Sequence, residues 1–131
     1  MIRISAPGKI HLIGEHSVVY GEPAIISAVG LRTFAEAEKS DKILVRDRKT
    51  DFIQEWSVDD VLDFAHRVKN IWEDGKKTSD FSRVFEIIRG NNFKKIVIGT
   101  ALHRLGIEGG ISLVLDREIP IGSGLGSSAS L

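Results

Sequence analysis

The chain has 131 residues, of which 42% are hydrophobic and 27% are charged, a composition that supplies one globular domain and excludes extensive disorder. Its 18 basic and 18 acidic residues give a formal net charge of zero, so the chain has no broad attraction for a nucleic-acid backbone. The absence of cysteine excludes disulfides, thiolate nucleophiles, zinc fingers and iron–sulfur clusters.

The N-terminal segment does not have the pattern of a secretory leader. Charged side chains, among them Arg3, Lys9 and Glu15, interrupt it before an apolar run reaches signal-peptide length. Nowhere do about 18 successive apolar residues occur, the length that a membrane-spanning helix needs. We therefore expect a soluble cytoplasmic protein with neither a membrane nor a nucleic acid as partner.

The first part of the chain has the pattern of short β-strands. Residues 2–5 alternate apolar and polar side chains, Pro7 and Gly8 predict a break, and a second apolar piece stops at Gly14. Strand composition returns in three further segments, residues 24–29, 33–38 and 42–46. This pattern predicts a curled antiparallel sheet, in which residues 47–56 form a loop or an edge.

The hydrophobic period becomes helical from Ser57, which is a suitable N-cap with two aspartates in the turn that follows. We expect this helix to end before Gly75. Its apolar stripe consists of Val58, Val61, Leu62, Ala65, Val68 and Trp72.

Two shorter helices and a strand follow in the predicted order. Residues 81–88 form a short helix, and Asn92 is the expected N-cap of another that ends at Gly106. Residues 111–115 form the last predicted strand. We expect the helices to pack on the sheet in an α+β arrangement.

A glycine- and serine-rich loop occupies residues 120–130. Glycines let backbone N–H groups approach an anion closely, and serine hydroxyls add donors or a ligand for magnesium. The loop lacks the lysine of a Walker motif, Ser127 replaces the third glycine of a dinucleotide fingerprint, and the hydrolase elbow G-x-S-x-G is missing. Taken alone, the loop is either a phosphate cradle or a solvated turn.

A second group of chemically useful side chains lies near the N-terminus. Lys9 begins one apolar piece and Glu15 and His16 end it, at points where glycines turn the chain sharply. Considered singly, each is equally compatible with an exposed surface charge. No histidine and carboxylate have metal-ligand spacing on one helix face, so we expect no zinc site. We assign structural roles to the other histidines, His11, His66 and His103.

Together the two groups resemble signature motifs of the kinase superfamily that contains galactokinase, homoserine kinase, mevalonate kinase and phosphomevalonate kinase. The first motif is Pro-Gly-Lys at 7–9 with Gly-Glu-His-Ser-Val-Val-Tyr-Gly at 14–21, and the second is Pro-x-x-x-Gly-Leu-Gly-Ser-Ser-Ala at 120–129. The Glu-His-Ser-Val-Val version is similar to that of mevalonate kinases. Galactokinases are expected to have an acidic residue where Val18 stands.

The resemblance implies the α+β fold of the superfamily's N-terminal domain, which is also seen in the second domain of a small-subunit ribosomal protein. It further implies ATP- and Mg²⁺-dependent phosphorylation of mevalonate to 5-phosphomevalonate in isoprenoid precursor synthesis. By position, Lys9 would lie near the reacting hydroxyl and His16 would contact the substrate carboxylate. Glu15 would hold the part of the site around His16 in place. Ser128 would help to hold magnesium. The triphosphate would be wrapped by Gly122, Ser123, Gly124, Leu125, Gly126, Ser127 and Ser128.

The resemblance also implies that residues 1–131 are the N-terminal ATP- and substrate-binding domain of a longer kinase. In the family, the third glycine-rich motif, the carboxylate that shares magnesium and the aspartate proposed as base lie further along the chain. We therefore expect an N-terminal fragment, cut at the phosphate-binding loop, with little or no turnover alone; a genuine short protein is the alternative. A homodimer is one assembly that the resemblance allows for the full-length protein.

Two rival functions remain open at this stage. One is another kinase of the same superfamily, for phosphomevalonate or a sugar, which substrate competition would distinguish. The other is a non-catalytic binding module, with RNA as partner by analogy with the ribosomal fold. The acidic residues of the first β region make the second rival unfavourable, since RNA binding needs a basic face with aromatic side chains. These residues are Glu22, Glu36 and Glu38.

Overall fold

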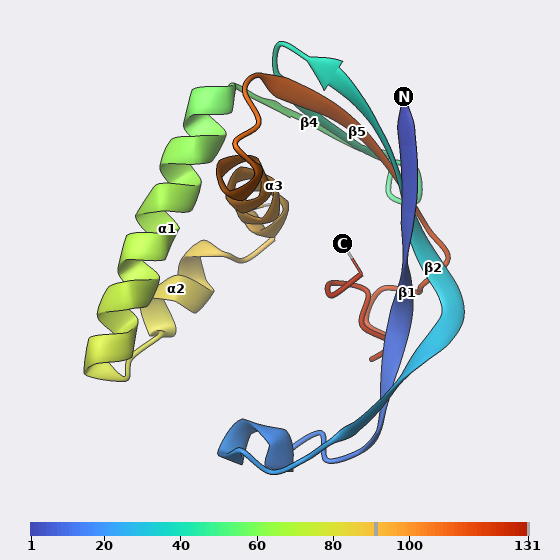
Figure 1. Cartoon of the computed structure of the whole chain (residues 1–131), viewed down its shortest axis with the longest axis vertical. Helices are drawn as coiled ribbons and strands as arrows, with labels where there is room; N and C mark the ends of the chain where they lie inside the picture. The colour runs from blue at the N-terminus through green and yellow to red at the C-terminus, as the bar shows by residue number, and fades with distance from the viewer. Residues whose placement is uncertain (91, 131) are drawn as a thin grey trace. The chain divides into compact units, whose positions relative to one another are not determined.

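The fold is described from a computed structural model, in which residues 1–90 and 92–130 are described (Figure 1). The elements of these residues are β1 (Ile2–Ile13), the 3₁₀ turn η1 (Ser17–Tyr20), β2 (Ile25–Ser40), β3 (Ile43–Asp47), β4 (Phe52–Trp56), α1 (Val58–Thr78), α2 (Ser82–Ile87), α3 (Asn92–Leu105) and β5 (Gly110–Arg117). Their strands form one sheet in the order β1-β2-β5-β3-β4. One sheet with helices confirms the predicted α+β class.

β1 and β2 are each a single long strand, whereas the sequence predicted two pieces for each. The predicted break at Pro7 is instead an irregularity in the antiparallel ladder: Pro7 pairs with Arg32, and Lys9 with Ala28. Three residues of β2 therefore face one residue of β1. Proline has no N–H to donate, so it is tolerated where the ladder is interrupted. The register shifts there without ending the strand.

The remaining strands agree more closely with the sequence pattern. β3 falls within the predicted segment 42–46 apart from its last residue, and β5 extends the predicted strand 111–115 at both ends. β4 lies within residues 47–56, for which a loop or an edge was predicted. It occupies the end of the strand order and is an edge strand.

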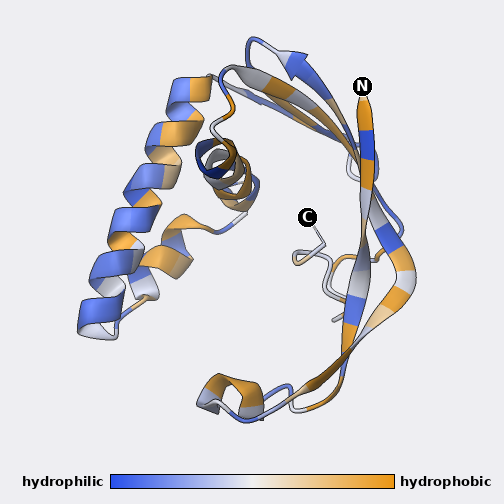
Figure 2. Cartoon of the chain, in the orientation of Figure 1, coloured by the Kyte–Doolittle hydropathy of each residue, from blue (hydrophilic) through white to orange (hydrophobic). Residues whose placement is uncertain are grey.

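α1 begins at the predicted cap. The Ser57 hydroxyl oxygen accepts a hydrogen bond from the backbone N–H of Asp60 at 3.1 Å, which satisfies one of the free donors of the first turn. Figure 2 shows the apolar residues along one side of α1. Trp72, predicted to belong to the buried stripe, is 41% exposed and tilts against Phe81 with the ring centroids 4.8 Å apart. The buried residues of α1 are Val61, Phe64, Ala65, Val68 and Gly75.

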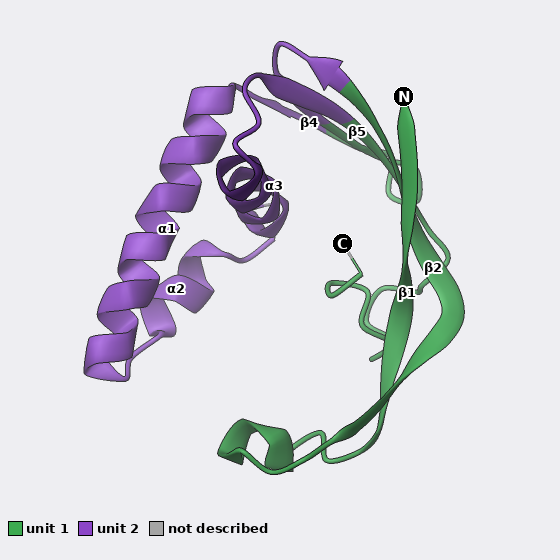
Figure 3. Ribbon diagram, viewed as in Figure 1, with its two compact units in different colours: residues 1–38, 45–53, 113–131 green, residues 39–44, 54–112 purple. Residues whose placement is uncertain are grey.

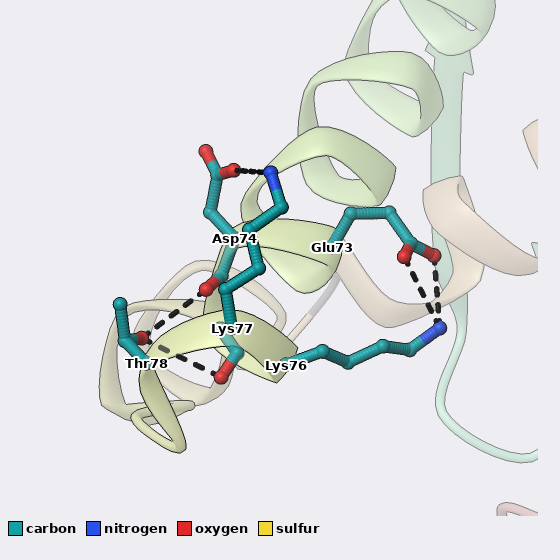
Figure 4. A network of polar contacts seen from close by, with 6 residues as sticks. Glu73, Asp74, Lys76, Lys77 and Thr78 are labelled. Atoms are coloured by element: carbon teal, nitrogen blue, oxygen red, sulfur yellow. Dashed lines mark hydrogen bonds and ion pairs between the residues drawn. The ribbon is translucent and has the colours of Figure 1, made fainter.

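The predicted end of α1 before Gly75 is wrong, because the helix continues to Thr78. Gly75 is buried, and a Cβ there would lie 2.8 Å from the carbonyl oxygen of Asp80, so glycine serves close packing at this position. Ion pairs one turn apart, Lys76 with Glu73 and Lys77 with Asp74, support the last turns (Figure 4). The hydroxyl of Thr78 donates to the carbonyl of Asp74 at 3.2 Å.

α3 begins at Asn92, which is the first helical residue rather than a residue before the helix. Its side-chain amide donates to the carbonyl of Ile87 at 2.8 Å and so ties α3 to the end of α2. α3 packs against α1 through Gly99, where a Cβ would lie 2.7 Å from the carbonyl oxygen of Val61. His66 of α1 and His103 of α3 also meet, with ring nitrogens 3.4 Å apart.

The chain divides into two compact units (Figure 3). Unit 1 contains residues 1–38, 45–53 and 113–131, and unit 2 contains residues 39–44 and 54–112. Unit 2 holds the helices, whose core is Phe64, Val68 and Val84 with four partly buried isoleucines around it. Among the helices of the described residues, none combines the length and the apolar character needed to cross a membrane. The residues of both signature motifs lie in unit 1.

Candidate functional site

The glycine loop, residues 120–130, follows β5 and turns at each of its glycines. Gly122, Gly124 and Gly126 have φ angles of 76°, 74° and 74°, a left-handed conformation that other residues rarely adopt. A Cβ added at Gly122 or Gly124 would meet nothing within 4 Å. The glycines of this loop are therefore needed for backbone conformation, and one side of the loop is open.

Hydrogen bonds inside the loop fix its path. The hydroxyl of Ser123 donates to the carbonyl of Pro120 at 2.8 Å. The carbonyl of Gly126 accepts from the N–H groups of Ala129 and Ser130, at 2.9 and 3.0 Å. Residues 127–130 thus form a single helix-like turn that starts at Gly126, as expected for a chain entering a helix.

The far end of the loop is tied to β2 by a buried pair of hydroxyls. The oxygens of Thr33 and Ser130 are 2.7 Å apart. The single hydroxyl proton of Ser130 is donated to the carbonyl of Ser127 at 2.9 Å, so Thr33 is the donor to Ser130. The glycine loop is therefore held at both ends, by β5 and by β2.

Several backbone N–H groups of the loop have no acceptor among the described residues: those of Gly124, Gly126, Ser127 and Ser128. Two of them belong to the start of the helix-like turn, where the free donors of a helical turn point outward. Successive main-chain N–H groups in left-handed and turn conformations form a concavity that binds anions. The loop therefore has the donors for a phosphate group without using any charged side chain.

Lys9 meets this loop directly. Its backbone N–H donates to the carbonyl of Leu125 at 2.9 Å. Its side-chain stem lies against Gly126, where a Cβ would be 2.8 Å from Lys9 Cγ. At the neighbouring Gly8, a Cβ would be 2.8 Å from the Leu125 carbonyl oxygen. Two segments more than 100 residues apart in the sequence are thus packed together, and they bring one cation to the glycine loop.

His11 contacts Lys9, and sequence reasoning missed this contact. Lys9 Nζ and His11 Nδ1 are 2.9 Å apart, and both side chains are partly buried. Residues two apart on a strand lie on the same face, so the spacing within β1 was the available signal. His11 therefore lies beside the candidate site.

Glu15 and His16 are exposed in the turn after β1. His16 precedes η1 without a side-chain capping hydrogen bond, and the carbonyl of Gly14 accepts from the N–H of Val18 at 3.0 Å. Within residues 1–90 and 92–130, no hydrogen bond or ion pair joins Glu15 or His16 to the glycine loop. The structure therefore brings together Lys9, Leu125 and Gly126, while the roles of Glu15 and His16 stay predictions.

The fit to magnesium is poorer than the fit to phosphate. Ser128 is exposed and offers one hydroxyl oxygen. In the part of the chain that the structure describes, no group of three or more His, Cys, Asp or Glu side chains could hold a metal ion. Asp116, on β5, is 3.8 Å from the guanidinium of Arg48. The hydroxyl of Ser128 alone does not form a metal site.

Comparison with known proteins agrees with the motif resemblance. The family model described as GHMP kinases N terminal domain matches residues 91–131, which include the glycine loop. A mevalonate kinase of Pyrococcus abyssi is 35% identical over the whole chain, which spans 36% of that relative.

Two solved structures give the same result. The crystal structure of Methanococcus jannaschii mevalonate kinase matches 98% of the chain with a TM-score of 0.70 and 26% identity, and 36% of that protein is covered. Lactococcus lactis galactokinase, in complex with galactose, matches 98% of the chain with a TM-score of 0.67 and 26% identity, and 29% of it is covered. The chain thus spans about a third of the length of the proteins that it matches. The chain has the fold of the matching part of these kinases, and it is similar along its whole length to part of the mevalonate kinases.

Proposed function

We propose that residues 1–131 are the ATP- and substrate-binding N-terminal domain of a kinase that phosphorylates mevalonate. The observation that carries the proposal is the contact of Lys9 with the glycine loop at Leu125 and Gly126. A cation and a set of main-chain donors at one place are what transfer of a phosphoryl group requires, because that reaction depends on positioning and charge stabilisation.

The glycine loop is the proposed binding site for the triphosphate of ATP. The free N–H groups of Gly124, Gly126, Ser127 and Ser128 point to this role, and the open side at Gly122 leaves space. Ser123 and Leu125 shape the loop through the bonds to Pro120 and Lys9. ATP would supply the phosphoryl group and Mg²⁺ would neutralise part of its charge, with the Ser128 hydroxyl as one ligand.

Lys9 is proposed to lie beside the acceptor hydroxyl. An ammonium group stabilises the negative charge that develops on an alcohol oxygen as it attacks phosphorus. The stem of Lys9 is held against Gly126, so its charge is kept close to the proposed phosphate site. The triphosphate and the acceptor hydroxyl would then both lie next to Lys9.

His16 and Glu15 are the proposed substrate contacts at the turn after β1. Both are exposed and are therefore accessible to a ligand. The choice of mevalonate as acceptor is supported by the names of the relatives. A sugar acceptor is the second candidate, favoured by the fold match to galactokinase. Mevalonate offers a carboxylate to His16 and a sugar does not, so competition between the two acceptors separates the candidates.

Turnover is proposed to need more than these residues. The chain spans about a third of its relatives, and its described residues contain no group of three or more His, Cys, Asp or Glu side chains that could hold a metal ion. We therefore expect ATP binding by the chain itself, and phosphorylation only when the remaining portion of a kinase is present.

The experiment has two steps. Adding ATP with magnesium chloride to the ¹⁵N-labelled chain should shift the amide signals of Gly124, Gly126 and Ser128. A fusion of the chain to the corresponding remaining portion of the Pyrococcus abyssi kinase should release ADP only when mevalonate is present, and Lys9→Met should abolish that release. Lys39→Met, at an exposed residue outside the site, is the control. Loop amides that ATP does not move, or a fusion that prefers galactose, would contradict the proposal.

A further inference from the structure

The contact between Lys9 and His11 indicates which tautomer the histidine adopts. Lys9 Nζ and His11 Nδ1 are 2.9 Å apart. A lysine ammonium can only donate hydrogen bonds, so Nδ1 must be the acceptor. The ring proton of this tautomer lies on Nε2.

The strand keeps the two side chains in register with each other. Lys9 pairs with Ala28 and His11 with Ile26 across the β1–β2 ladder, so both residues project from the same face of β1. The side chain of Lys9 is thereby restrained at two points, along its stem by Gly126 and at its tip by His11. A flexible lysine side chain otherwise has many rotamers, and each restraint reduces their number.

We propose that His11 is a positioning residue for Lys9. This inference rests on the proposed function, in which Lys9 acts on the acceptor hydroxyl. The Lys9 ammonium donates one of its three N–H groups to His11. Its other two N–H groups are free for the oxygen of the alcohol and a phosphate oxygen. His11 itself need not touch either substrate.

The pairing can be tested on the chain itself. Nitrogen-15 NMR should give His11 the signature of the Nε2–H tautomer. Lys9 should react slowly with an amine-acylating reagent. Mass spectrometry measures its rate of acylation and compares it with that of the exposed Lys39 in the same sample. His11→Val should accelerate acylation of Lys9 about fivefold, because the ammonium loses its acceptor. His11→Asn places an amide oxygen near the position of Nδ1 and should restore the slow rate to within about twofold.

His66→Asn is the matched control, since it removes an exposed histidine of unit 2 and should leave the Lys9 rate unchanged. An unchanged Lys39 rate and circular dichroism spectrum show that each variant is folded. An Nδ1–H tautomer in the unmodified chain, which needs no variant, would overturn the inference. So would equal acylation of Lys9 in the unmodified chain and His11→Val.

The effect on the reaction is read from the fusion described above. His11→Val should lower kcat by about tenfold with little change in the KM for ATP. His11→Asn should recover most of kcat. An active fusion in which His11→Val leaves kcat unchanged would overturn the inference while leaving the proposed function intact. A fusion that neither binds ATP nor turns over would instead refute the proposed function.

Discussion

Gly126 and Lys9 pack so closely that no side chain fits between them: a Cβ on Gly126 would lie 2.8 Å from Lys9 Cγ and 3.2 Å from Cε. Gly126→Ala should therefore push the lysine side chain away, in addition to straining a backbone with φ of 74°. We expect a loss of about 1–2 kcal/mol in the free energy of unfolding from the strained conformation and a loss of ATP affinity of about tenfold from displacement of the loop and the lysine.

Gly124→Ala is the matched comparison for this prediction. Gly124 has the same φ of 74°, but a Cβ there would meet nothing within 4 Å. It should lose similar stability and much less ATP affinity. Equal affinities of the two variants, measured by isothermal titration calorimetry, would show that the packing of Lys9 on Gly126 does not matter for binding.

Removing either of the two hydroxyls that join β2 to the loop should lower the free energy of unfolding, but by unequal amounts. Ser130→Ala leaves the buried hydroxyl of Thr33 without its acceptor, which costs about 1–3 kcal/mol. Thr33→Val removes the donor and leaves Ser130 still bonded to Ser127, so it should cost about 1 kcal/mol. Urea unfolding of both single variants and the double variant gives the coupling energy. Fully additive effects would mean that the hydrogen bond makes no net contribution.

The contact of α1 with α3 leaves no room for a methyl group at Gly99. A Cβ there would lie 2.7 Å from the carbonyl oxygen of Val61 and 2.8 Å from Cβ of Ala65. Gly99→Ala should destabilise the chain by about 1–3 kcal/mol through overpacking, although alanine favours a helix. The adjacent exposed residue gives the control, since Thr100→Ala should be neutral or slightly stabilising. A stabilised Gly99→Ala variant in thermal unfolding would contradict the packing.

The stability that Asp80 contributes at the start of α2 should depend on pH. The hydroxyl and then the backbone N–H of Ser82 donate to this carboxylate and lower its pKa below the ordinary value. The carboxylate therefore stabilises the folded chain at pH values above the ordinary aspartate pKa. This contribution is lost as the pH falls through the lowered pKa of the folded state. Asp80→Asn keeps an acceptor oxygen but does not titrate, so the difference in melting temperature between it and the unmodified chain should change only in this acidic range.

Several features could be read from the sequence because a local rule decided them. Ser57 caps α1 as its side-chain chemistry predicts, and the glycines of residues 122–126 adopt a left-handed backbone conformation that suits their residue type. The resemblance of two distant motifs added what local rules cannot supply, namely the expectation that Lys9 and the glycine loop share one site. The two segments are in contact, and their shared function stays a prediction.

Other features could not be read because tertiary packing decided them. Gly75 is a helix breaker by propensity, yet here it gives the close approach of Asp80 and Phe81, and the helix continues. Pro7 is a strand breaker by the same rule, yet an irregularity in β2 accommodates it. The contact of His11 with Lys9 was recognised only in the structure. A hydrogen-bond acceptor next to a cation has no pattern of its own in a single sequence.

The irregular pairing at Pro7 has a consequence for how this part of the chain can vary. Side chains on a strand alternate between its faces, so a one-residue insertion or deletion between Pro7 and Lys9 would turn the lysine away from Leu125 and Gly126. The number of residues in this segment is therefore constrained more strictly than their identities. Homologues should tolerate exchange of the side chain at position 10 far more readily than any change in spacing.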